Sequence, residues 1–242
     1  MNHEIHNLFY ITPERIKKGQ LSITGQTYHH IKNVLRAKIL QTIFFTDGKG
    51  NRYQTEVTDI TNNEIKLRIL EKIFIPREEN LKFDLAFVPI KGKRNDYLIE
   101  KATELGVNKF FIFYSAASVI KKMGISKIEH LKNITISAML QSLQYYQPEI
   151  VVLDNIDKLL SIFPEYNSVV VADQQGDTKL PNLKERVLYI VGPEGGFENY
   201  EIEKFIESGA KPISLGKKRL RSETAAIVGI VKILTALESK EN

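Results

Sequence analysis

A glycine-rich segment, Val191 to Phe197, separates a hydrophobic run from a helical pattern and constrains the fold more than any other feature. The run before it, Val187 to Ile190, is typical of a buried strand, and the helical pattern starts near Asn199. Three glycines and a proline over so few residues leave backbone N–H groups exposed at a helix N-terminus. An α/β protein usually holds a polar ligand at such a place. The alternative is a tight turn in which the glycines supply positive φ angles.

A second strand-to-helix junction, Leu215 to Ala226, follows within about the length of one βαβ unit. It lies between a predicted strand at Pro212–Leu215 and a predicted helix at Ala225–Leu237. Cations precede this helix, where the helix dipole disfavours positive charge, so an anion in the same place would offset the cost. These cations are Lys217, Lys218, Arg219 and Arg221. The alternative is a surface loop with Glu223 as its partner and Thr224 as the helix cap.

A third cationic segment, Lys91-Gly92-Lys93-Arg94, precedes a predicted helix from Arg94 to Leu105. It again suggests a phosphate contact, although Asp96 in the first turn would also neutralise it, and both interpretations stay open. His29 and His30 are adjacent and therefore face different ways on a helix, which makes them a poor metal pair. The other histidines are scattered, and we predict no metal site.

The positive charge is concentrated in the first part of the chain. Residues 1–72 carry 11 Lys and Arg against 7 Asp and Glu, whereas residues 73–242 carry 23 against 22. A basic small domain beside a nearly neutral one suggests contact with a polyanion, although an ordinary solvated surface would also explain the excess. No segment is long and apolar enough to cross a bilayer, no secretory signal is visible, and cysteine is absent. We therefore expect a cytoplasmic protein without disulfides or thiol chemistry.

The hydrophobic pattern predicts a small domain at residues 1–72, a linker at 73–80 and a larger domain at 81–242. The small domain should contain a helix from Thr12-Pro13 to Gly19, a helix at Tyr28–Lys38 and the hairpins of an antiparallel barrel. Its predicted strands are Leu21–Thr24, Thr42–Phe45, Tyr53–Val57 and Ile65–Ile69.

The larger domain alternates strands with helices, which predicts an α/β fold with a mostly parallel sheet. Its predicted strands are Leu81–Val88, Lys109–Tyr114, Val169–Ala172, Val187–Val191 and Pro212–Leu215. Ser126-Lys127-Ile128-Glu129 has the form of a capping box that opens a long helix ending before Pro148. The final helix is nearly all apolar, so we expect it in a core or an interface.

Four motifs along the chain resemble the RsmE family of 16S ribosomal RNA (uracil-N(3))-methyltransferases, which belongs to the knotted SPOUT methyltransferases. They are HHIKNVLR (His29–Arg36), KATELGV (Lys101–Val107), GPEGGF (Gly192–Phe197) and LGKKRLRSETA (Leu215–Ala225). The resemblance implies an N-terminal PUA-like barrel that helps to hold RNA and a C-terminal α/β domain with a trefoil knot. It also implies that the knot loops bind S-adenosylmethionine and that the active site forms across a homodimer.

The resemblance also implies site residues. We expect cofactor contacts from a strand end and the two loops: Ala172, Asp173, Gly192, Pro193, Glu194, Gly195, Gly196, Leu215, Gly216, Leu220, Arg221, Thr224 and Ala225. We expect contacts with the 16S rRNA of the small ribosomal subunit from His30, Arg36, Lys91, Lys93, Arg94, Lys217, Lys218 and Arg219. The chain departs from the family at Ala117 and Gln144, where arginines suited to RNA are usual.

Methylation of uracil at N3 requires loss of the proton that normally takes part in pairing, so the base must be unpaired or flipped out. Negative charge then spreads over the ring nitrogen and both carbonyls, and a fixed guanidinium stabilises it. We assign this role to Arg221, with Glu194 and Glu223 as candidates for the general base. The alternatives are a SPOUT methyltransferase of another RNA site or atom, a non-catalytic RNA-binding or ribosome-assembly protein, and an α/β enzyme for a phosphorylated metabolite.

Overall fold

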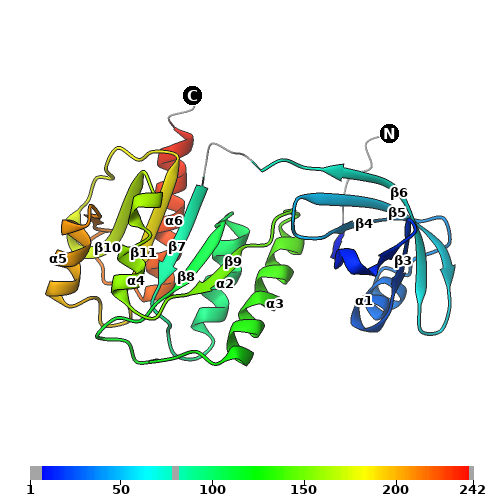
Figure 1. The fold of residues 1–242 in the computed structure, drawn as a ribbon, viewed down its shortest axis with the longest axis horizontal. Helices are drawn as coiled ribbons and strands as arrows, with labels where there is room; N and C mark the ends of the chain where they lie inside the picture. The colour runs from blue at the N-terminus through cyan, green and yellow to red at the C-terminus, as the bar shows by residue number, and fades with distance from the viewer. Residues whose placement is uncertain (1–6, 78–81, 240–242) are drawn as a thin grey trace. The chain divides into compact units, whose positions relative to one another are not determined.

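The chain folds into two compact units, which a computed structural model describes over residues 7–77 and 82–239 (Figure 1). The N-terminal unit comprises residues 1–77 and the later segment Met139–Gln147, and the C-terminal unit comprises residues 78–138 and 148–242. Each unit has its own sheet and its own hydrophobic core.

The N-terminal unit is built on a six-stranded sheet with the order β1-β4-β5-β6-β3-β2. Its strands are β1 (Leu8–Tyr10), β2 (Ile16–Lys17), β3 (Gln20–Ile23), β4 (Thr42–Thr46), β5 (Asn51–Ile60) and β6 (Ile65–Phe74). Neighbouring strands are antiparallel except for β1 and β4, so the predicted hairpins are confirmed. Strand β6 continues to Phe74 and therefore takes up the start of the expected linker, whose residues 78–80 lie outside the described residues.

The helices of this unit are shorter than the sequence predicts. The helix expected from Thr12-Pro13 to Gly19 starts as predicted, with Thr12 in the N-cap position, but its extent is wrong: it is a 3-10 turn, η1 (Pro13–Arg15), that ends before strand β2. Ile16 pairs with Leu21 instead, across a turn in which Gly19 has a φ of 75°. The helix expected at Tyr28–Lys38 begins earlier, as α1 (Gly25–His29), and continues as the π-helix η2 (His30–Val34). It ends before Arg36, whose φ of 50° is incompatible with a right-handed helix.

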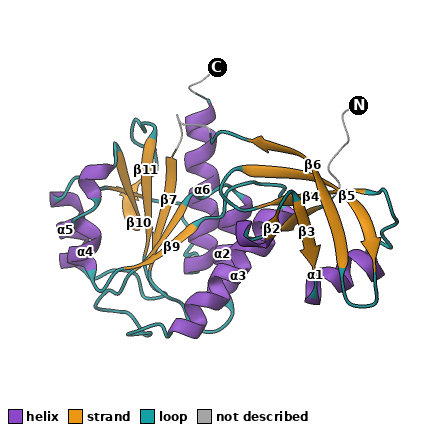
Figure 2. Ribbon diagram, turned by 45° about the vertical axis from the view of Figure 1, so that its right-hand side comes forward, coloured by secondary structure: helices purple, strands orange, loops and turns teal. Residues whose placement is uncertain are grey.

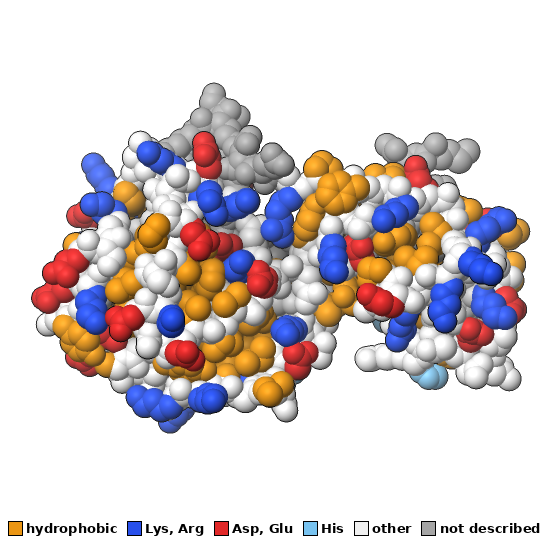
Figure 3. Space-filling view, in the orientation of Figure 1, with side chains coloured by type: hydrophobic (Ala, Val, Ile, Leu, Met, Phe, Trp, Pro, Cys, Tyr) orange, Lys and Arg blue, Asp and Glu red, His pale blue; other side chains and the backbone are white. Residues whose placement is uncertain are grey.

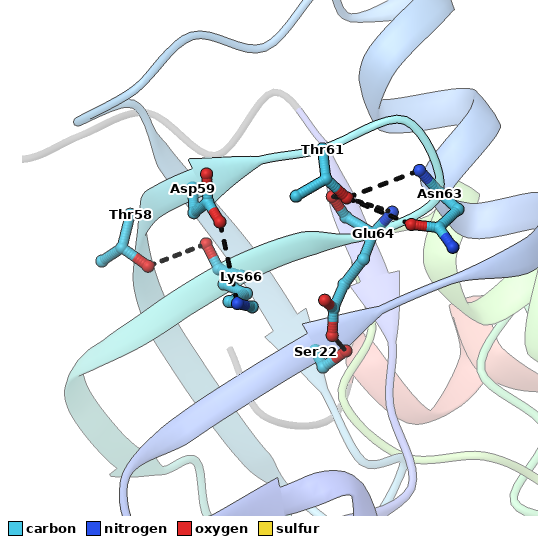
Figure 4. Close-up of polar contacts among 7 residues, drawn as sticks. All are labelled: Ser22, Thr58, Asp59, Thr61, Asn63, Glu64 and Lys66. Atoms are coloured by element: carbon cyan, nitrogen blue, oxygen red, sulfur yellow. Dashed lines mark hydrogen bonds and ion pairs between the residues drawn. The ribbon is translucent and has the colours of Figure 1, made fainter.

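Side-chain hydrogen bonds close the turn between β5 and β6 (Figure 4). The Thr61 hydroxyl accepts a hydrogen bond from the Glu64 N–H at 3.1 Å and donates one to the Asn63 Oδ1 atom at 3.2 Å. The Glu64 carboxylate in turn accepts a hydrogen bond from the Ser22 hydroxyl on β3. These contacts tie three strands together at the polar tip of the sheet.

The segment Met139–Gln147 completes the N-terminal unit. The Gly50 N–H donates to the Tyr145 carbonyl at 2.8 Å, and the Tyr146 hydroxyl donates to the Ile75 carbonyl at 2.7 Å. The Arg77 guanidinium lies over the Tyr146 ring, 4.5 Å from its centroid. Gly50 has no room for a side chain, because a Cβ atom there would meet the Tyr146 hydroxyl.

The C-terminal unit holds a six-stranded sheet with the order β12-β10-β11-β7-β8-β9. Its strands are β7 (Lys82–Phe87), β8 (Lys109–Ile112), β9 (Glu149–Val152), β10 (Ser168–Asp177), β11 (Arg186–Val191) and β12 (Lys211–Ile213). Every neighbouring pair is parallel, which confirms the predicted sheet type. The helical elements are α2 (Arg94–Glu104), α3 (Ile125–Gln141), α4 (Ile156–Leu160), η3 (Phe163–Glu165), α5 (Asn199–Glu207) and α6 (Ser222–Glu238).

Helices cover both faces of this sheet, because side chains alternate along each strand (Figure 2). Phe83 and Leu85 of β7 pack with the buried sides of α2, α3 and α6, whereas Ala86 packs with α4 and α5. Gly229 of α6 has no Cβ atom, which lets the Tyr189 side chain of β11 lie directly against the helix. The apolar final helix is therefore part of the core, as one of its two predicted interpretations has it.

Several helix ends differ from the prediction. Helix α3 begins at Ile125, so Ser126 lies within its first turn and the expected capping box is wrong. A capping box occurs instead at α5, between Glu198 and Glu201. Helix α6 begins at Ser222 with Arg221 in the N-cap position, so Thr224 is not the cap. Strand β9 and helix α4 were not predicted, and Leu81 lies outside the described residues.

Candidate functional site

A cavity of about 710 Å³ lies at the carboxyl ends of β10, β11 and β12. Its volume falls within the range of about 300–1,000 Å³ that is usual for small-molecule sites. The end of β10, the loop after β11 and the loop after β12 form its walls, so the structure brings both glycine-containing loops to one place. Of the residues expected at the cofactor, these line the cavity: Ala172, Asp173, Gly192, Pro193, Glu194, Gly195, Gly196, Leu215, Gly216, Leu220 and Ala225. Arg221 and Thr224 are not among the lining residues.

The loop after β11 combines a tight turn with an exposed backbone. The Gly196 N–H donates to the Pro193 carbonyl at 2.9 Å, and Gly196 has a φ of 83°. Gly192 is buried against the Phe197 ring, which a Cβ atom would approach to 3.0 Å. Gly195 and Gly196 are exposed and line the cavity. The turn interpretation and the ligand-loop interpretation of this segment are therefore compatible.

The loop after β12 presents its cations to solvent. Lys217, Lys218 and Arg221 are exposed, and Lys218 lines the cavity. Arg219 also lines it, and its guanidinium donates to the Glu194 carbonyl at 3.1 Å. The two loops thus contact each other beside the cavity.

The end of β10 bends around β12. Ala172 and Asp177 are both in register with Ile213, so residues 173–176 bulge out between them. The Ser214 N–H donates to the Asp177 carbonyl at 2.8 Å, and Gly176 lies directly against the Ile213 backbone. This bulge carries Asp173, Gln174 and Gln175 to the wall of the cavity.

Arg94 at the start of α2 pairs with a carboxylate that is distant in the sequence. Its Nη2 atom donates to the Glu194 Oε1 atom at 2.6 Å, and its Nη1 atom lies 4.0 Å from the Glu223 Oε2 atom. Lys91 and Lys93 are exposed. Glu223 is buried and pairs with Arg94, so the interpretation that made it the partner of the Lys217–Arg221 loop is not supported.

Asp96 does not neutralise the cations before α2. Its carboxylate accepts hydrogen bonds from Lys127 at 2.6 Å and from His130 at 2.9 Å, both on α3. Burial alone would raise the pKa of Asp96, but these hydrogen bonds outweigh burial and hold the pKa below its usual value.

The remaining RNA-contact candidates lie on the N-terminal unit. His30 and Arg36 are exposed, and the His30 ring meets the Phe9 ring edge-on at 5.6 Å. Lys and Arg side chains gather over this unit on the face seen in Figure 3. At the positions where the family usually has arginine, Ala117 follows β8 and Gln144 donates to the Ser142 hydroxyl at 3.0 Å.

The first turns of α5 are a fourth contributor to the cavity, which was not expected from the sequence. Asn199, Ile202 and Glu203 line it and share one helix face through their i, i+3 and i, i+4 spacing. The helical pattern directly after the glycine loop is the signal that would have found them. No group of three or more His, Asp or Glu side chains suited to a metal ion occurs within residues 7–77 and 82–239. None of the described helices is long and apolar enough to span a membrane.

The chain matches two protein families. Residues 77–234 match the RNA methyltransferase domain, and residues 23–70 match the RNA methyltransferase PUA domain. It is 31% identical over 216 residues to ribosomal RNA small subunit methyltransferase E of Mesomycoplasma hyopneumoniae, covering 88% of this chain and 92% of the relative. It is 28% identical over 239 residues to the Bacillus subtilis protein of the same name, covering 92% and 93%.

Solved structures agree with these relatives. Ribosomal RNA small subunit methyltransferase E from Neisseria gonorrhoeae, bound to S-adenosyl methionine, superposes with a TM-score of 0.83 at 26% identity over 95% of this chain and 97% of that one. A probable rRNA-methyltransferase from Porphyromonas gingivalis superposes with a TM-score of 0.84 at 28% identity over 95% and 98%. The fold is thus a SPOUT-type α/β unit with an N-terminal PUA-like unit, and the chain belongs to the RsmE family of ribosomal RNA small subunit methyltransferases.

Proposed function

We propose that the protein transfers a methyl group from S-adenosylmethionine to ring nitrogen 3 of a uridine in the 16S rRNA of the small ribosomal subunit. The observation that carries this proposal is the cavity at the ends of β10, β11 and β12, which is walled by both family-specific loops. The relatives named above support the substrate class, and the Neisseria structure solved with S-adenosyl methionine supports the cofactor.

The residues present suit this cofactor. Leu215, Leu220 and Ala225 offer apolar surface for an adenine ring. Asp173 and Glu203 offer carboxylates that can accept hydrogen bonds from ribose hydroxyls or attract a positively charged group. The glycine loop offers backbone N–H groups as donors. S-adenosylmethionine supplies an electrophilic methyl group, so the protein needs no covalent intermediate.

Residues of the chain position the base and stabilise its charge. A general base takes the N3 proton of the uracil ring. The N3 lone pair then attacks the methyl carbon, and the bond between that carbon and the cofactor's sulfur breaks. Arg221 is exposed beside the cavity, and we assign it the stabilisation of the anionic ring. Glu194 and Glu223 remain the candidate bases, and alignment of the reacting atoms supplies most of the acceleration.

The RNA and subunit contacts belong to the same proposal. We assign RNA contact to the basic residues 1–72 together with the exposed lysines at the starts of α2 and α6, Lys91, Lys93, Lys217 and Lys218. We assign catalysis to residues 81–242 apart from the segment Met139–Gln147, which belongs to the N-terminal unit. A homodimer is supported by exposed apolar side chains on neighbouring helices, Val228 and Val231 on α6 and Tyr97 on α2. Because the proposed substrate is ribosomal RNA, we expect the protein to act in the cytoplasm.

The decisive experiment incubates small ribosomal subunits and free 16S rRNA with labelled S-adenosylmethionine and maps the product by nucleoside mass spectrometry. We expect N3-methyluridine at one position. A methyl group on another atom would instead indicate a related RNA methyltransferase.

Ala117 and Gln144 favour one second candidate, a ribosome-assembly protein that binds RNA without catalysis, since two cations of the family are absent there. Calorimetry with S-adenosylmethionine separates the two functions. Absence of cofactor binding and of methyl incorporation would support the second candidate.

A further inference from the structure

We propose that Arg94 is a positioning residue that fixes the shape of the cofactor loop Gly192–Gly196 through the side chain of Glu194. The proposal rests on the proposed function only where it names this loop as a wall of the cofactor site. It replaces the expectation that Arg94 binds an RNA phosphate.

The guanidinium is oriented by two hydrogen bonds. Its Nη2 atom donates to the Glu194 Oε1 atom at 2.6 Å, and its Nε atom donates to the Lys91 carbonyl at 3.2 Å. The second bond anchors the side chain at the beginning of α2, so the first bond transmits the position of that helix to the loop. Glu194 itself lines the cavity.

Burial makes this ion pair stronger than an ordinary surface pair. The side chains of Arg94 and Glu194 are 33% and 29% exposed, and that of Glu223 is 10% exposed. Water screens charges less at such positions than at the open surface. Glu194 should therefore follow Arg94 rather than sample solvent.

The second carboxylate of the cluster makes Arg94 difficult to remove. The Oε2 atoms of Glu194 and Glu223 are buried, and neither has a hydrogen-bond partner among the described residues. Both carboxylates face the same guanidinium, with Glu223 Oε2 at 4.0 Å from Nη1. Without Arg94 these two charges would lose their common cation, and the loop would move to separate or solvate them.

Glu194 is also held at its backbone. The Arg219 guanidinium donates to the Glu194 carbonyl, so one arginine at the start of α2 and another in the loop after β12 both contact Glu194. A cation at a helix N-terminus opposes the helix dipole, and the Glu194 carboxylate offsets that cost for Arg94. The pair thus stabilises both the beginning of α2 and the loop.

The first test observes the loop without any cofactor. Protein labelled with 15N-glycine is compared by NMR for wild type, Arg94→Ala, Arg94→Lys and Glu194→Gln. We expect the amide signals of Gly192, Gly195 and Gly196 to shift in all three variants, least in Arg94→Lys because it keeps a charge. Arg68→Ala is the matched control, since Arg68 pairs with Glu56 through the same atom types at 2.8 Å on the N-terminal unit.

The second test separates positioning from RNA binding. Arg94→Ala and Glu194→Gln should each weaken S-adenosylmethionine binding about tenfold, as expected for one charge-assisted hydrogen bond. The double variant should bind no more weakly than either single variant, and the KM for rRNA should change less than the cofactor Kd.

Unchanged loop signals and unchanged cofactor affinity in Arg94→Ala, with a raised KM for rRNA, would overturn the proposal and make Arg94 an RNA contact. If Arg94→Ala does not fold, Arg94→Lys and Glu194→Gln decide by the same signals. A wild-type protein that fails to bind S-adenosylmethionine would refute the proposed function, while the loop signals would still decide the role of Arg94.

Discussion

The cationic segments before α2 and before α6 look alike in sequence but differ in the folded protein. At the start of α2, Arg94 is half-buried and paired with the Glu194 carboxylate. Before α6, Arg219 is exposed, and its guanidinium donates a hydrogen bond to the backbone carbonyl of Glu194 rather than to the carboxylate. A cation at a helix N-terminus therefore stabilises the folded protein, instead of remaining free for a ligand, when a carboxylate from a distant segment pairs with it.

The other cations of both segments are exposed. Lys91 and Lys93 lie before α2, and Lys217, Lys218 and Arg221 lie before α6. Exposed cations retain their ability to neutralise phosphates. The comparison thus separates arginines that hold the loop from side chains that are available to RNA.

The largest effect is expected at Arg221, the exposed cation closest to the start of α6. Arg221→Ala should abolish measurable methyl transfer, a loss of about 10³-fold if the guanidinium stabilises the anionic base. Cofactor affinity should remain near normal, because Arg221 does not line the cavity. Single-turnover methyl incorporation and calorimetry measure the two quantities, and near-normal turnover would remove Arg221 from the mechanism.

Paired lysine variants compare the exposed parts of the two segments. Lys217→Ala/Lys218→Ala and Lys91→Ala/Lys93→Ala should each weaken rRNA binding and flatten its salt dependence, by about 0.7 in slope for each cation that contacts single-stranded RNA. Filter binding over a series of salt concentrations measures this slope. Lys204→Ala, which removes an exposed lysine paired with Asp157, is the control. A double lysine variant that leaves the salt-dependence slope unchanged would show that its segment does not contact RNA.

Arg219→Ala sharpens the comparison between the two arginines that hold Glu194. It should weaken cofactor binding only about threefold, because it loses one hydrogen bond from an exposed guanidinium to a neutral carbonyl. Calorimetry beside Arg94→Ala measures the difference. A larger loss in Arg219→Ala than in Arg94→Ala would reverse the assignment of the main contact.

The smallest effect is expected at Asp96, which lies near the cations before α2 but serves α3. Its pKa is lowered in the folded protein, so its contribution to stability is present above the unfolded pKa and is lost as the pH falls through the folded pKa. Asp96→Asn should lower the free energy of unfolding at pH 7 by about 1 kcal/mol, and the difference from wild type should shrink in acid. Chemical denaturation over a pH series measures it. A shift of the loop glycine signals in Asp96→Asn would contradict the separation of Asp96 from Arg94.

Local patterns predicted the elements that depend on neighbouring residues. The glycine loop after Val191 and the parallel strands are visible in sequence because turn residues and buried strands have their own composition. Helix starts were less predictable, since Ser126 and Thr224 have cap chemistry but lie inside the first turns of α3 and α6. The backbone conformation, rather than the residue type, decides at which residue a helix begins.

The pairing of Arg94 with Glu194 depends on strand order, which local patterns do not encode. Strands β7 and β11 are parallel neighbours, so the loops that follow them meet at one edge of the sheet. The two residues are therefore in contact although 100 positions separate them in the chain. Both strands could be predicted from the sequence but their adjacency could not, so only a phosphate or the nearby Asp96 was expected as a partner for the cations at Lys91–Arg94.

Tyr145 and Tyr146 come from the middle of the chain but pack against Gly50 and Ile75 of the N-terminal unit, which they complete like a plug. A recombinant fragment that stops at Arg77 would lack this plug and leave the backbone N–H of Gly50 without its acceptor. Swapping the PUA-like unit between relatives would likewise require exchange of two separate stretches of gene. Insertion or truncation near residues 139–147 should consequently damage a module that lies far away in the sequence.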